Sequence, residues 1–295
     1  MRSKIIAFIS ILATTLSFGQ TQISVDPDVR PMSKGEFPSY SVEVPQSDVK
    51  TIDKDWKKYL STGTKAKLIE LGGEVIMPGA VNKNISSDPF NVYSKLLETN
   101  TGVRITAWFN FKDSFYISKQ YNNDMDVAAK KYMLDFAMQE YHDVVSNELD
   151  GEKGRLKKLQ DEMNDLIKAE EKSTKRINED RRSIDRAKND ITANEGDQQR
   201  QADLISNQKG VVSSTTDPDA NKEAVKALKD LEATKKKLEK QNEKMNKDID
   251  GWNKEIREEQ RKIDASRADQ KLKSEQIENQ KQVVASVQDR LAAIK

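Results

Sequence analysis

The chain has 295 residues, of which 34% are charged, 35% hydrophobic and 6% aromatic. So few apolar residues cannot fill one large core, and the composition indicates a small core together with long solvated helices. The net charge of +1 gives no driving force towards nucleic acid or anionic lipid. The sequence contains no cysteine, which excludes disulfides, thiolate metal sites, thiol nucleophiles and a lipidated cysteine anchor.

Residues 1–19 have the pattern of a cleavable secretory signal peptide. Arg2 and Lys4 form a basic start, a mainly apolar stretch follows, and Ser17 and Gly19 stand at −3 and −1 of a cleavage site. The apolar stretch is shorter than the roughly 20 residues of a membrane span, which disfavours the alternative of an uncleaved anchor. No later stretch is apolar enough to span a membrane. We therefore expect an exported protein, in the periplasm or at the cell surface.

A small α+β domain is predicted for residues 37–120. Residues 20–36 before it contain Pro27 and Pro31, show no periodicity and are interpreted as a flexible leader. Alternating apolar residues predict strands at 40–44, 68–71, 74–77, 92–97 and 103–111, and helical spacing predicts one helix through Trp56. Ser47 or Asp48 is expected to cap that helix. The order β-α-β-β-β-β is compatible with a ferredoxin-like layer or a variant of it.

The last predicted strand, residues 103–111, has one apolar face and one face that is polar except at Trp108. Two interpretations of that face stay open. In the first, a long helix or its base covers Trp108. In the second, Trp108, Tyr93 and Arg104 form an exposed face that binds a partner, a small ligand or a glycan.

The remainder of the chain predicts a long antiparallel helical hairpin. Residues 121–208 form its first helix, 209–220 its loop and 221–295 its second helix, because apolar residues recur in heptad rows on both sides of a Gly-, Ser- and Asp-containing stretch. The fold class is therefore an α+β head, with one helix packed on an antiparallel sheet, followed by a coiled-coil hairpin. Val211 and Val212 are expected at the bend, where a partner can reach them.

Allowed registers of such a hairpin differ by seven residues, because a positions of one helix meet d positions of the other. The preferred register places Ile191 opposite Leu231, with apolar residues facing apolar ones along most of its length. The next register would place Glu170 against Glu259, and burying like charges is unfavourable.

Gly151 and Gly154 interrupt the first helix, and each costs about 1 kcal/mol relative to alanine in a helix interior. One interpretation is a hinge between head and hairpin. The other is that the helix tolerates both glycines without bending. The sequence favours neither.

Catalytic chemistry has little support in the sequence. His142 is the only histidine, and no nucleophile elbow, phosphate loop or dinucleotide fingerprint is present. Acidic residues alternate with Lys and Arg along the helices, which is typical of a solvated coiled-coil flank. Asp217 and Asp219 are interpreted as helix caps, since a calcium loop would need further ligands. We expect no enzyme activity, no cofactor and no metal.

The signal peptide, the helix Trp56-Lys57-Lys58-Tyr59-Leu60 and the hairpin together resemble exported coiled-coil proteins of Gram-negative bacteria that have no defined activity. The resemblance implies placement in the cell envelope and no reaction. We expect a structural or interaction protein whose hairpin is a spacer or docking scaffold, with envelope proteins or further copies of itself as partners. The alternative is a head that binds a small ligand or glycan, with the coiled coil as its tether.

Overall fold

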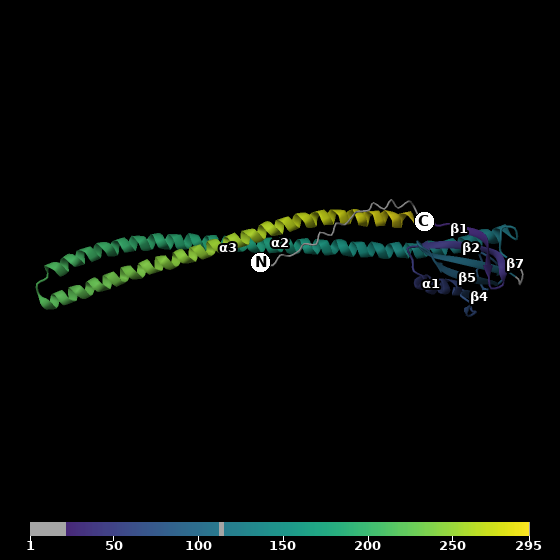
Figure 1. Cartoon of the computed structure of the whole chain (residues 1–295), viewed down its shortest axis with the longest axis horizontal. Coiled ribbons are helices and arrows are strands. Elements are labelled where there is room, and N and C mark those ends of the chain that lie inside the picture. Colours follow the sequence, from purple (N-terminus) through teal and green to yellow (C-terminus); the bar gives the residue numbers. More distant parts are fainter. Residues whose placement is uncertain (1–21, 112–114, 295) are drawn as a thin grey trace. The chain divides into compact units, whose positions relative to one another are not determined.

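The computed structural model describes residues 22–111 and 115–294, so the predicted signal peptide lies outside the described residues. The fold class is confirmed: an antiparallel sheet with one packed helix is followed by two long helices that pack against each other (Figure 1). By its internal contacts the chain divides into two units, residues 1–154 with 281–295 and residues 155–280. Within the described part of the chain, no helix combines the length and apolar character that crossing a membrane requires.

The sheet of the first unit is antiparallel, with the strand order β1-β2-β6-β5-β4-β3 and β7 paired to β6. Its elements are β1 (Val25–Met32), β2 (Gly35–Pro45), α1 (Val49–Ser61), β3 (Ile69–Leu71), β4 (Glu74–Ala80), β5 (Phe90–Glu98), β6 (Gly102–Phe111) and β7 (Phe115–Tyr116). The sequence predicts a ferredoxin-like layer or a variant of it, but the sheet, as the structure describes it, lacks the second crossover helix of the ferredoxin-like motif. Helix α1 carries the chain from β2 to β3 at the far edge, and hairpins then return it until β6 pairs with β2.

Strand β1 lies at residues 25–32, within the stretch 20–36 predicted as a flexible leader, and corrects that prediction. Pro27, Val29 and Pro31 are alternate residues of β1, and the backbone N atoms of alternate residues face the same edge of a strand. Proline has no N–H, and Val29, between them, donates its backbone N–H to its neighbour Asp28 at 2.8 Å. These three residues leave no free donor on that edge. The prolines therefore protect an edge strand, although a local reading takes them as strand breakers.

The core of the first unit lies between the sheet and the helices α1 and α2 (Asn123–Ser214). Asp48 caps α1 as predicted, accepting a hydrogen bond from the Thr51 backbone N. Trp56 of α1 is fully buried and donates its indole N–H to Ser94 Oγ at 2.8 Å, while its ring meets Phe136 of α2 edge-on at 4.9 Å. The first turns of α2 are thus part of the head's core.

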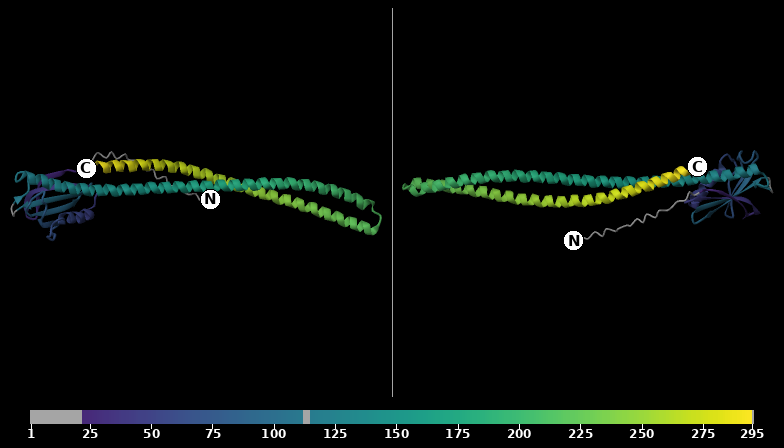
Figure 2. Two further views of the ribbon diagram at one scale, coloured as in Figure 1. Left: turned by 180° about the vertical axis from the view of Figure 1, so that it is seen from behind. Right: turned by 90° about the horizontal axis from the view of Figure 1, so that it is seen from above.

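Helix α3 (Pro218–Ala293) follows α2 after only Thr215–Asp217, so the turn is much shorter than the predicted loop 209–220. The helix α2 continues through Gly210, where an added Cβ would meet no atom within 4 Å. Pro218 begins α3 at its first position, where a missing N–H costs nothing. In the second unit the two arms run antiparallel beside each other (Figure 2).

Helix α2 also stays helical through Gly151 and Gly154. An added Cβ at either glycine would meet no atom within 4 Å, so close packing does not require them. The boundary between the two units falls directly after Gly154. A hinge at these glycines remains a prediction.

Candidate interaction surfaces

Trp108 and Tyr93 lie side by side on β6 and β5, and both are buried, at 1% and 5% exposure. They belong to an aromatic cluster, made of Met32, Tyr93, Trp108 and Tyr116 with Phe37 and Ile76 packed against it. The indole N–H of Trp108 donates to the backbone oxygen of Arg30 in β1 at 3.2 Å. The face is therefore covered, and its cover is the β1–β2 hairpin where a helix was expected. Neither aromatic ring forms an exposed binding face.

Glu74 ties the tip of that cover to the far side of the sheet, and sequence reasoning missed it. Its carboxylate is 1% exposed and accepts hydrogen bonds from Ser33 N at 2.7 Å and Ser33 Oγ at 2.6 Å. Lys95 Nζ lies 3.2 Å away. Burial raises the pKa of Glu74, but the hydrogen bonds from Ser33 and Lys95 outweigh it, so the pKa lies below its usual value. The sequence Ser33-Lys34-Gly35 could have indicated the β1–β2 turn that Glu74 contacts.

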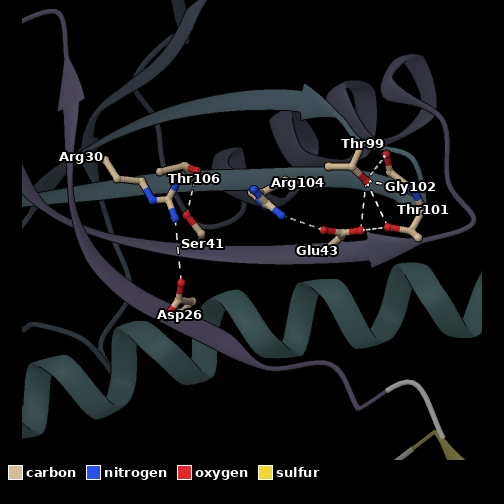
Figure 3. Close-up of polar contacts among 9 residues, drawn as sticks. All are labelled: Asp26, Arg30, Ser41, Glu43, Thr99, Thr101, Gly102, Arg104 and Thr106. Carbon is tan, nitrogen blue, oxygen red and sulfur yellow. Dashed lines mark hydrogen bonds and ion pairs between the residues drawn. The ribbon is translucent and has the colours of Figure 1, made fainter. Parts of the chain in front are cut away.

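Arg104 follows the same alternation along β6 as Trp108 and points towards Glu43 of β2 (Figure 3). Its Nη2 is 3.2 Å from Glu43 of β2, which also accepts hydrogen bonds from Thr101 and Thr99. The Thr101 hydroxyl, more than the other donors, holds the pKa of Glu43 below its usual value. The Arg104 side chain is 41% exposed, so this pair contributes about 1 kcal/mol or less. Through Thr99 and Thr101, Glu43 joins β2 to the β5–β6 turn.

Val211 and Val212 lie in the last turn of α2, beside the turn between the arms. Val211 is 46% exposed, whereas Val212 is half-buried. Asn221 of α3 donates its side-chain N–H groups to Val212 O at 2.9 Å and Thr215 O at 3.1 Å. The tip is thus a closed, hydrogen-bonded turn in which Val211 alone of the two valines exposes much apolar surface.

The seam of the second unit consists of α2 and α3 side chains that recur at steps of three and four residues. Its buried members include Ser173, Ile177, Ile184 and Ala187 on α2 and Ile263 and Ser266 on α3. Asn194 Nδ2 donates to Asn242 Oδ1 at 3.0 Å, and antiparallel continuation from that pair sets Ile191 opposite Met245. The predicted register, with Ile191 opposite Leu231, is wrong by 14 residues, or two heptads.

Glu259 is the most buried charge of the seam, at 6% exposure. It accepts hydrogen bonds from Arg176 across the seam at 3.2 Å and from Lys262 at 2.6 Å. Its pKa is lowered to about 2, first by Lys262 and then by Ser173 and Arg176. A second carboxylate, Glu170, accepts from Arg267 and Gln270 of the opposite helix. Polar groups therefore bridge the arms at several levels.

The outer surface of α2 has a shallow, open groove of about 540 Å³ that includes Ile167, Glu171, Lys175 and Arg182. Its lining includes many charged side chains and its shape is open, whereas a small-molecule site is concave. No three His, Asp or Glu side chains of residues 22–111 and 115–294 are grouped to hold a metal ion. His142 is exposed on α2, 3.6 Å from Asp143.

Comparison with known proteins assigns no family to this fold: no family model matches the chain, and no curated protein matches it either.

Proposed function

We propose that this protein is a non-enzymatic, exported structural or interaction protein whose α2–α3 hairpin acts as a spacer or docking scaffold in the cell envelope. The observation that carries the proposal is the seam of the second unit. Its buried residues face the other arm, while the positions outside it are exposed and densely charged. Such a surface suits a solvated rod better than a catalytic or ligand-binding domain.

Length supports the spacer role. Within the second unit α2 runs from residue 155 to 214, and about 60 helical residues at ~1.5 Å each span ~90 Å. Exposed apolar side chains on these arms are few and scattered, namely Ile167, Leu204, Val211 and Leu272. We therefore propose that protein partners, or further copies of this chain, recognise charged flanks and the tip. The ligand- or glycan-binding alternative loses its main support because Trp108 and Tyr93 are buried.

The test places a photo-crosslinking amino acid at exposed hairpin positions, Arg182 or Lys236, in the full chain expressed in its natural host. The expected result is an adduct with an envelope protein, or with a second copy, from the hairpin sites. Leu97, exposed on the head, is the matched control site. Adducts from Leu97 alone, or recovery of the chain in the cytoplasmic fraction, would contradict the proposal.

A further inference from the structure

The apolar seam residues of the hairpin can meet in two registers that differ by 14 residues. In the structure Ile191 lies opposite Met245, and in the shifted register it would lie opposite Leu231. Both registers keep a positions against d positions, because 14 is a multiple of seven. The shifted register gives the apolar pairs Ile184–Leu238, Ile177–Met245, Leu166–Ile256 and Leu159–Ile263. Apolar pairing is therefore also available in the shifted register.

Polar contacts distinguish the two registers. The Asn194–Asn242 hydrogen bond and the Arg176–Glu259 ion pair both cross the seam in the observed register. In the shifted register, Asn194 would face Leu228. Glu259 is buried, and an unpaired buried charge is strongly unfavourable, whereas the half-buried Asn194 and Asn242 would lose a hydrogen bond at smaller cost.

The seam carboxylates Glu170 and Glu259 also have polar partners on the opposite arm only in the observed register. Glu170 is paired with Arg267 and Gln270 in the structure, at 2.8 Å and 2.9 Å. The shifted register would set Glu170 against Trp252 and Glu259 against Met163. Each carboxylate would then face an apolar side chain.

We propose that the polar seam residues Asn194, Asn242, Glu170 and Glu259 hold the hairpin in the observed register, one of several spaced by seven residues that its apolar residues allow. A change to the register shifted by 14 residues would slide one arm along the other by roughly 21 Å, at 1.5 Å per residue. The inference concerns the hairpin alone and does not depend on the proposed function.

The tip is the competing explanation for the observed register. Ile205 and Ala224 are buried near it, and the shifted register would require the end of α2 to unwind. The experiment must therefore change the polar residues and leave the tip intact.

The experiment uses the full chain with three introduced cysteines, Ile191→Cys, Leu231→Cys and Met245→Cys. The protein has no cysteine of its own, so mild oxidation reports the register as the ratio of 191–245 to 191–231 disulfides, read by peptide mass spectrometry. We expect the 191–245 disulfide to dominate in this parent. Adding Glu170→Leu and Asn194→Leu leaves Asn242 without its partner in the observed register. In the shifted register, the two introduced leucines would pack against Trp252 and Leu228. The 191–231 fraction should then rise about tenfold or more.

The matched control adds Asn242→Leu to the Asn194→Leu variant. The two introduced leucines then pair in the observed register, whereas the one at position 242 would face Asp180 in the shifted register, so the 191–245 disulfide should dominate again. Asn194→Leu alone serves as the milder variant if helix content by circular dichroism falls in the double variant. If the 191–231 fraction does not rise when Glu170→Leu and Asn194→Leu are added, the tip sets the register and the proposal is overturned. Disulfides formed only between molecules overturn it too.

Discussion

Glu74 on β4 accepts two hydrogen bonds from Ser33, in the β1–β2 turn, although β1 and β4 are not neighbours in the sheet. The contact shows that the hairpin crosses the sheet face and ends over the opposite side. It closes the aromatic cluster around Trp108. The cover over this sheet face is thus held by Glu74, which lies 41 positions after Ser33 in the sequence.

Glu74→Gln should destabilise the protein by about 2 kcal/mol, because hydrogen bonds to a buried charge contribute ~1.5–3 kcal/mol and Lys95 loses its counterion. Urea unfolding followed by tryptophan fluorescence measures this. Glu70→Gln is the matched control, since the Glu70 side chain is 68% exposed. Equal effects from both variants would mean that the Ser33 contact does not hold the hairpin down.

Replacing both edge prolines, Pro27→Ala with Pro31→Ala, should promote self-association. The change restores two N–H donors on the edge of β1 that does not pair with β2. Free donors on an edge strand favour pairing with another chain. Sedimentation velocity at rising protein concentration measures the effect. Pro89→Ala, outside any strand, is the control. A variant that stays as dispersed as the parent would show that the prolines do not protect this edge.

Glu140 makes stability depend on pH near neutrality. Its pKa is raised to about 7 by burial, then by Asp55 of α1 and Asp143, with Lys58 acting in the opposite direction. The folded state therefore binds the proton more tightly than the unfolded state, and its stability falls as pH rises from about 4.5 to about 7.

Glu140→Gln should remove that loss and stabilise the protein by about 1 kcal/mol at pH 8, after allowance for solvent screening of a partly exposed group. Urea unfolding at pH 5 and pH 8 tests it, with the exposed Glu171→Gln as control. An unchanged pH slope in Glu140→Gln would rule out this carboxyl as the source.

Gly210→Ala should raise stability by about 1 kcal/mol, because the residue is helical and an added Cβ has free space. Gly72→Ala should lower it, since Gly72 has φ of +61° in the β3–β4 turn. Thermal unfolding followed by circular dichroism compares the two. Destabilisation by Gly210→Ala would instead indicate that residue 210 lies in a loop, as the sequence predicted.

Gly151 and Gly154 allow a test of the hinge. Spin labels at the exposed positions 147 and 157 should give a broad distance distribution if the helix bends there, and alanine at both glycines should narrow it. A narrow distribution in the parent, at the length of a straight helix, would leave the glycines as tolerated residues.

Local patterns in the sequence were enough to predict most elements. The strands on either side of Gly72-Gly73, the β5 and β6 strands and the Asp48 cap of α1 were predicted from residues within a few positions of each other, and all are confirmed. The heptad rows predicted two antiparallel arms for the same reason. Periodicity reports which face of an element is apolar, and this depends only on the element itself.

Only the tertiary structure decided what each face meets. Pro27 and Pro31 are strand residues because β1 lies at the edge of the sheet, and Trp108 is buried because that hairpin crosses it. The register is visible only in contacts such as Asn194–Asn242, between residues 48 apart in sequence. Heptad spacing is identical in every register, so it determines that the arms pair but leaves their alignment to long-range polar contacts and the position of the turn.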